Sequence, residues 1–150
     1  MPADTIRQNK AHQVLFLPER EQEIKMNQNI TGTILLIDDE APVRDAVRDI
    51  LDMEGWVVLA ADSGERGLQL FAQHQTEIVL VILDMSMPGL SGTDTLHLLR
   101  QMDKQVKVLV SSGYSQFDLT EKIAKQNITG FLQKPYNAMK LINTIRYYLP

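Results

Sequence analysis

The chain has 150 residues, a hydrophobic fraction of 44% and a net charge of −4, which suit one globular domain with a real core. The charge gives no support for direct nucleic-acid binding, and the lack of cysteine excludes a disulfide framework, a zinc site and a thiol nucleophile. No apolar run approaches the length of about 18 residues that a membrane span needs, and no secretory signal is present. We therefore expect a cytoplasmic protein.

Residues 1–31 do not join the regular pattern of the rest and are predicted to be an N-terminal extension or linker. They contain a short apolar run, Val14–Leu17, which is followed by Pro18 and a polar, charged stretch. The folded domain is expected to cover residues 32–150.

In that domain, apolar runs alternate five times with segments of helical periodicity. Strands are predicted at 33–37, 56–60, 78–83, 106–110 and 130–133, and helices at 42–53, after Ser63, at 93–102, at 118–123 and at 137–148. Such alternation predicts an α/β protein whose parallel sheet is covered on both faces. The expected fold is a flavodoxin-like (βα)5 doubly wound sheet with strand order 2-1-3-4-5.

Asp84 closes the run 78–83, whose six apolar residues indicate a strand buried on both faces. Asp38 and Asp39 follow the first strand, which would lie beside the third in this strand order. Three carboxylates within about 4–6 Å would repel by roughly 3–4 kcal/mol per close pair. A hard cation such as Mg²⁺ would offset this repulsion. The alternative for Asp38 and Asp39 is a solvated acidic turn before the next helix.

Ser112 and Lys134 stand at the ends of the fourth and fifth predicted strands. Taken alone, Lys134 could be a surface lysine and Ser112 could make a local turn hydrogen bond. At one sheet edge with three carboxylates, they instead predict a site where Asp84 attacks phosphorus and forms an acyl phosphate. Lys134 and Ser112 would then bind the phosphoryl oxygens.

Four segments in order resemble the receiver domain of two-component response regulators: Leu36–Glu40, Leu83–Gly92, Ser112–Gly113 and Phe131–Pro135. The resemblance covers residues 32–149. It implies that Asp84 accepts the phosphoryl group, a reaction that the domain catalyses on itself without being an enzyme for other substrates.

The resemblance also implies roles for the residues around Asp84. Mg²⁺ would be bound by Asp39 and Asp84, by Asp38 mostly through water, and by the backbone carbonyl of Ser86. Ser112 and Lys134 would hold the phosphoryl group, and Phe131 would be the aromatic switch residue that responds to Ser112. The alternative for Phe131 is a plain core aromatic. Residues at two further positions, Ser86 and Tyr114, would tune the lifetime of the phosphate.

The implied phosphate donor is a histidine kinase or a histidine phosphotransfer domain. The implied output surface, and a candidate homodimer interface, consists of the fourth helix, the fifth strand and the fifth helix. Two other classes remain open: a Mg²⁺-dependent phosphohydrolase with an Asp nucleophile, and a receiver-like interaction module that takes no phosphate. Ser86 stands where such a hydrolase would have a second Asp.

The segment Gln13–Pro18 resembles the end of a histidine-kinase ATP-binding domain. We therefore expect either a free-standing regulator or the C-terminal receiver of a hybrid sensor kinase.

Tyr114 is bulky enough to obstruct the attacking water, so the phosphorylated form is predicted to last minutes or longer. Replacing it by alanine should accelerate dephosphorylation, which loss of label from the phosphorylated protein would measure. An unchanged rate would remove Tyr114 from the set of lifetime-tuning residues.

Overall fold

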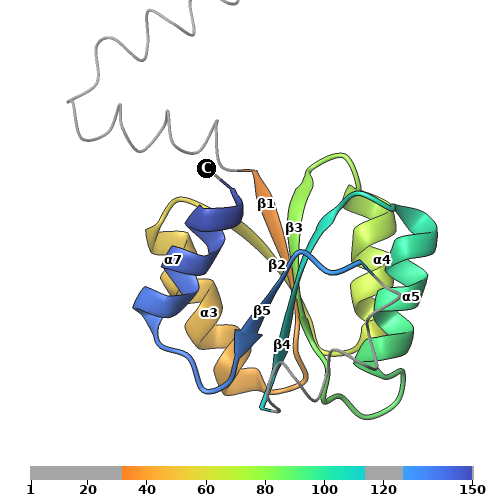
Figure 1. Cartoon of the computed structure of the whole chain (residues 1–150), viewed down its shortest axis with the longest axis horizontal. Coiled ribbons are helices and arrows are strands. Elements are labelled where there is room, and N and C mark those ends of the chain that lie inside the picture. The colour runs from red at the N-terminus through yellow and green to blue at the C-terminus, as the bar shows by residue number, and fades with distance from the viewer. Residues whose placement is uncertain (1–31, 114–126, 150) are drawn as a thin grey trace, which may run out of the picture.

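One parallel sheet of five strands organises the protein (Figure 1). The computed structural model describes residues 32–113 and 127–149. The strands are β1 (Thr33–Ile37), β2 (Val57–Ala61), β3 (Ile78–Asp84), β4 (Lys107–Ser112) and β5 (Gly130–Gln133). Their order is β2-β1-β3-β4-β5 and all pairings are parallel, which confirms the predicted flavodoxin-like topology.

Helices cover both faces of this sheet (Figure 1). The helices α3 (Ala41–Met53) and α7 (Ala138–Tyr148) lie on one face, and α4 (Gly64–His74) and α5 (Gly92–Met102) lie on the other. Among the described residues, no helix combines the length and apolarity that spanning a bilayer would require.

The two faces of the central strands supply two separate cores. In β1, Ile34 and Leu36 pack with α3 and α7, whereas Leu35 and Ile37 pack with α4 and α5. This division follows from the alternation of side chains along a strand, and it explains why these strands are apolar throughout. Burial of each large aliphatic side chain contributes roughly 1.5–3 kcal/mol. Because apolar burial stabilises both cores, the buried polar groups of the sheet lie mainly at the strand ends.

Side-chain caps fix where three of the helices begin. Ser63 accepts a hydrogen bond from the backbone N–H of Arg66 at 3.1 Å, which confirms it as the cap of α4. Ser91 caps α5 in the same way, and Asn137 caps α7. Each cap is worth about 1 kcal/mol. The helix starts lie close to the carboxyl edge of the sheet and define the loops around it.

The second strand begins one residue later than predicted. Trp56 precedes it, and its backbone N–H donates to the carbonyl of Leu51 at 3.0 Å, closing the end of α3. Gly55 adopts a positive φ of 89° at this turn, a conformation that glycine tolerates best. The predicted bounds of β1 and β5 are confirmed, and the other predicted bounds differ by at most two residues. The predicted helix 118–123 lies outside the described residues.

Several glycines approach their neighbours closely, and two of them stand at the starts of α5 and β5. A Cβ atom added to Gly92 would lie 2.4 Å from the Cα of Met85 and 2.7 Å from the carbonyl oxygen of Asp84. One added to Gly130 would lie 2.6 Å from the ring of Tyr148. The start of α5 and the start of β5 therefore accept no larger residue without movement of their neighbours. At Gly92 the neighbour is backbone, which cannot yield by a rotamer change.

Replacing Gly92 by alanine should lower the free energy of unfolding by about 1–3 kcal/mol, because overpacking outweighs the gain in helix propensity. Urea unfolding monitored by circular dichroism would measure it. Gly113→Ala is the control, since an added Cβ there meets nothing within 4 Å. Equal stability of the two variants would contradict the prediction.

Candidate functional site

Three carboxylates converge at the carboxyl edge of the sheet. Asp38 follows β1 directly, Asp84 is the last residue of β3, and the two strands are paired neighbours. Asp38, Asp39 and Asp84 each place one oxygen within 4.8 Å of the others, as predicted. Asp38 and Asp84 are each 1% exposed. The alternative of a solvated acidic turn is therefore wrong for Asp38.

Several hydrogen bonds fix the backbone around Asp38. Its Oδ1 accepts from the backbone N–H of Glu40 at 2.9 Å, and its own N–H donates to the carbonyl of Ala61 at 3.0 Å. The guanidinium of Arg44, one turn into α3, donates to the Asp38 carbonyl at 2.7 Å. These bonds hold the turn between β1 and α3 in one conformation.

Lys134 supplies the positive charge of this cluster. Its Nζ lies 2.8 Å from Oδ2 of Asp38, 3.4 Å from Oδ2 of Asp84 and 4.0 Å from Oε1 of Glu40. Burial by itself would lower the pKa of Lys134. The hydrogen bond and charge of Asp38, with the charges of Asp84 and Glu40, outweigh burial and raise this pKa above its usual value. The ammonium thus stays charged at neutral pH, facing the acids as predicted.

Asp84 has a carboxylate that the fold makes costly to ionise. Burial raises the pKa of Asp84 most, and the nearby charge of Asp38 raises it further. A hydrogen bond from the backbone N–H of Ser86, at 3.0 Å to Oδ1, acts in the opposite direction, as does Lys134. The net effect is a pKa above the usual value, held down in part by these two partners.

The donor set fits a hard divalent cation. Oδ1 of Asp39 and Oδ2 of Asp84 are buried, and neither makes a hydrogen bond within the described part of the chain. Lys134 alone cannot neutralise Asp38, Asp39 and Asp84, so the cluster keeps an excess of negative charge. Oxygen ligands with uncompensated charge are what Mg²⁺ prefers in proteins. The residues present therefore suit this ion.

The hydroxyl and switch candidates lie on β4 and β5. Ser112 is the last residue of β4 and is fully buried, and its carbonyl accepts a hydrogen bond from the backbone N–H of Lys134 at 2.8 Å. Phe131 is half-buried on β5 and packs against the core on the α4 and α5 side. Tyr114 lies outside the described residues.

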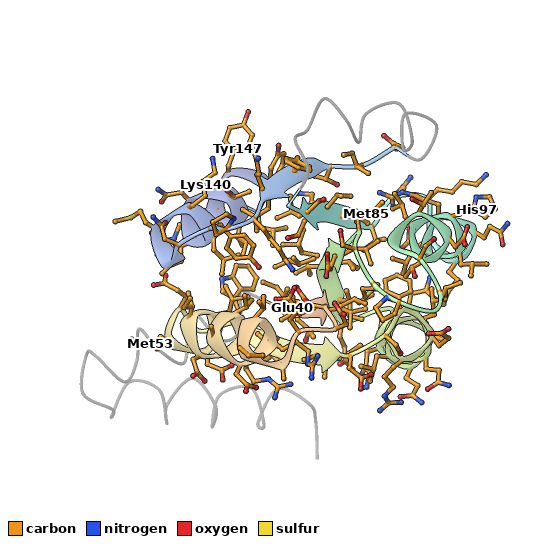
Figure 2. The ribbon with its side chains drawn as sticks, turned by 90° about the horizontal axis from the view of Figure 1, so that it is seen from below. Glu40, Met53, Met85, His97, Lys140 and Tyr147 are labelled. Carbon is orange, nitrogen blue, oxygen red and sulfur yellow. The ribbon has the colours of Figure 1, made fainter. Side chains whose placement is uncertain are left out.

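The structure adds residues to which the sequence patterns assigned no role. Glu40 and Arg44 contact the cluster directly, and Figure 2 shows Glu40 at this edge of the sheet, seen from below. Tyr136, two residues after Lys134, lies in the electrostatic field of Asp38 and Asp84. A hydroxyl this near a predicted strand end could have been noticed. The sequence position of Arg44 did not indicate that its side chain would contact Asp38.

A groove opens beside the cluster, between α3 and the segment that follows β5. It has a volume of about 540 Å³ and is mostly apolar, with Val43, Ala46 and Ile50 on the helix side and Pro135 and Tyr136 opposite. Glu40 and Lys134 also line it, so the groove reaches the polar cluster.

Comparison with known proteins supports one family. The family model described as "Response regulator receiver domain" matches residues 34–146. The chain is 24% identical over 117 residues to sporulation initiation phosphotransferase F of Bacillus subtilis, covering 78% of this chain and 93% of that protein. It is 34% identical over 116 residues to the transcriptional regulatory protein CpxR of Klebsiella pneumoniae, covering 77% of this chain and 48% of that protein. The chain thus spans only about half the length of CpxR.

Solved structures of response regulators are also similar to this chain. A response regulator receiver domain protein from Clostridium thermocellum is 31% identical, with a TM-score of 0.72, covering 79% of this chain and 94% of that chain. The response regulator TrrA from Thermotoga maritima, solved in complex with Mg²⁺ and BeF, is 28% identical. Its TM-score is 0.70, and the match covers 79% of this chain and 100% of that chain.

Replacing Asp84 by asparagine should raise the free energy of unfolding at pH 7, because the buried carboxylate has a raised pKa. The folded protein keeps a proton on Asp84 to a higher pH than the unfolded chain does. Stability is therefore lost as pH rises from the usual pKa of 3.8 through the raised one, and Asp84→Asn should flatten this decline. Urea unfolding across a pH series measures both effects.

The matched control is Asp62→Asn, because Asp62 follows β2 but is exposed. It should change stability by no more than about 0.5 kcal/mol. A lower stability of Asp84→Asn than of the wild type at pH 7 would contradict the expected sign.

Proposed function

Because this chain belongs to the response regulator receiver domain family, we propose that Asp84 accepts a phosphoryl group from a phosphohistidine and that the domain changes conformation in response. The observation that carries this proposal is the placement of Lys134 between two buried acids, with Nζ 2.8 Å from Asp38 and 3.4 Å from Asp84. A charged amine at this point is suited to the oxygens of a phosphoryl group arriving at Asp84.

The reaction forms a bond between a carboxylate oxygen of Asp84 and phosphorus, and it breaks the N–P bond of the donor, whose imidazole leaves with the electron pair. Asp84 needs no general base once it is ionised. Lys134 would neutralise one phosphoryl oxygen, and the hydroxyl of Ser112 would donate to another. The hydrogen bond from the N–H of Ser86 orients the attacking carboxylate.

Mg²⁺, when bound, would neutralise charge on the phosphoryl oxygens during transfer. Asp39, Asp84 and the backbone carbonyl of Ser86 would hold it, with Asp38 acting mostly through water. This assignment is supported by Oδ1 of Asp39 and Oδ2 of Asp84, which are buried and make no hydrogen bond within the described residues. It is also supported by the related TrrA structure, which is described as a complex with Mg²⁺ and BeF.

Signalling would follow as a shift between two conformers. Ser112 would move toward the phosphoryl group, and Phe131 would turn inward behind it. Ser112 and Lys134 are joined through their backbones, which supports a link between β4 and β5. The face that includes β5 and α7 would bind the target or a second copy of the chain, and Ser86 and Tyr114 would set the phosphate lifetime.

The donor would be a histidine kinase or a histidine phosphotransfer domain. The sensor kinase CckA of Brucella abortus is 28% identical over 132 residues, covering 87% of this chain and 14% of that protein. This relative supports one candidate context for the chain, namely a receiver domain that forms part of a hybrid kinase.

Incubation with acetyl phosphate and Mg²⁺ should add one phosphoryl group, detected by intact mass spectrometry. Asp84→Asn should abolish the adduct, because the nucleophile is gone, whereas Asp62→Asn should keep it. Lys134→Ala should slow the reaction roughly ten- to hundredfold, since it removes a charged hydrogen-bond donor. Phosphorylation of Asp84→Asn at the rate of the wild type would contradict the assignment.

A second measurement separates the three classes of function. Beryllofluoride with Mg²⁺ should form a stable adduct at Asp84 and shift backbone NMR resonances of β4 and β5. Steady release of phosphate from a small phosphate ester would indicate a phosphohydrolase instead. Absence of any response would indicate a module that acts by binding alone.

A further inference from the structure

Three buried oxygen atoms belong to residues near the carboxyl ends of β3, β4 and β5: Oδ2 of Asp84, Oγ of Ser111 and the hydroxyl oxygen of Tyr136. Within the described residues, none of the three makes a hydrogen bond of full geometry. Buried polar atoms without partners are rare, because each loses its bonds to water. Oδ2 of Asp84 has its ion pair with Lys134, so the hydroxyls of Ser111 and Tyr136 are the two groups that call for an explanation beyond packing.

Ser111 lies beside Asp84 through the register of the sheet. The Cα atoms of Asp84 and Ser111 are paired across β3 and β4, and the N–H of Met85 donates to the Ser111 carbonyl at 2.9 Å. Paired residues of adjacent strands lie about 4.8 Å apart and point to the same face. Two residues earlier in each strand, Ile82 and Leu109 belong to the core under α3 and α7, which identifies that face.

Tyr136 reaches the same place from the segment after β5. It packs against the core under α3 and α7, and its hydroxyl faces that of Ser111. The two hydroxyls are neighbours, without the geometry of a complete hydrogen bond. Burial, followed by the charge of Asp38, raises the pKa of Tyr136 to about 12, so its hydroxyl keeps its proton. Tyr136 is therefore a permanent donor at neutral pH.

We propose that Tyr136 is a positioning residue that acts on Asp84 through Ser111, with Tyr136 donating to Ser111 and Ser111 donating to Oδ2 of Asp84. The direction follows from the groups, because an ionised carboxylate only accepts, whereas a serine hydroxyl accepts and donates at once. This inference rests on the proposed function, since it concerns the geometry of the same nucleophile.

The consequence is a carboxylate held from two sides. The N–H of Ser86 donates to Oδ1 at 3.0 Å, and the hydroxyl relay from Tyr136 and Ser111 would hold Oδ2. Together they fix the plane of the Asp84 carboxylate and so the direction of its attack on phosphorus. Linked hydrogen bonds also strengthen one another in a low-dielectric interior.

The test compares Tyr136→Phe with Tyr147→Phe, a matched control because Tyr147 is 77% exposed on α7. Phosphorylation by acetyl phosphate at saturating Mg²⁺ is followed over a range of donor concentrations. Tyr136→Phe should lower the limiting rate constant about five- to tenfold with little change in the half-saturating donor concentration. Tyr147→Phe should match the wild type.

Ser111 gives an independent arm of the same experiment. Ser111→Ala should lower the limiting rate constant of phosphorylation as Tyr136→Phe does, whereas Ser111→Thr should preserve it because threonine keeps a hydroxyl. The double variant Ser111→Ala with Tyr136→Phe should be no slower than either single variant. Rates within twofold of wild type for Tyr136→Phe, or losses that multiply in the double variant, would overturn the relay.

A structural role alone would give a different result. Because the relay would act on the geometry of Asp84, Tyr136→Phe should slow phosphorylation whatever change it makes to the melting temperature. A lower melting temperature with an unchanged rate would assign Tyr136 to packing. If Tyr136→Phe does not fold, the Ser111→Ala and Ser111→Thr pair decides the question by the same rates.

One measurement separates failure of the relay from failure of the proposed function. If the wild type takes no phosphoryl group, the proposed function fails, and the relay is judged by NMR of the unphosphorylated chain labelled at the tyrosine ζ-carbons. Ser111→Ala should then shift the Tyr136 resonance and leave that of Tyr147 in place. An unmoved Tyr136 resonance would overturn the relay.

Discussion

The contact of one ammonium with two buried acids organises this end of the molecule. Lys134 is carried by the segment after β5, Asp38 by the end of β1 and Asp84 by the end of β3, so one charge cluster joins three parts of the sheet. Burying a charge is costly unless an opposite charge and hydrogen bonds accompany it. The cluster is surrounded by groups that supply such charges and hydrogen bonds, namely Glu40, Arg44 and the backbone N–H of Ser86.

The cluster is nevertheless incompletely balanced, and this imbalance is informative. Asp84 has a raised pKa, and oxygens of Asp39 and Asp84 lack hydrogen-bond partners within the described residues. A fold selected for stability alone would not keep such groups in its interior. Their arrangement suits a ligand that brings positive charge, such as the cation in the proposed function.

Apolar runs and the rule that strand ends share an edge were sufficient to predict the sheet, its order and the meeting of Asp38, Asp39, Asp84 and Lys134. Periodicity could not place Trp56, because an apolar residue just before a strand resembles its first residue. It also could not single out Arg44 or Tyr136. The contact of Arg44 depends on the turn that brings the Asp38 carbonyl beside α3, and the contact of Tyr136 depends on the segment after β5. Neither segment has a repeating pattern in the sequence.

The position of β5 in the sheet has a mechanical consequence. It is four residues long, and among the described residues it is the outermost strand on its side and pairs with β4 alone. Lys134 therefore follows an edge strand, and edge strands are among the parts of a sheet that open most readily. Because Lys134 contacts Asp38 and Asp84, a change of charge at these acids would alter a contact that holds this edge of the sheet.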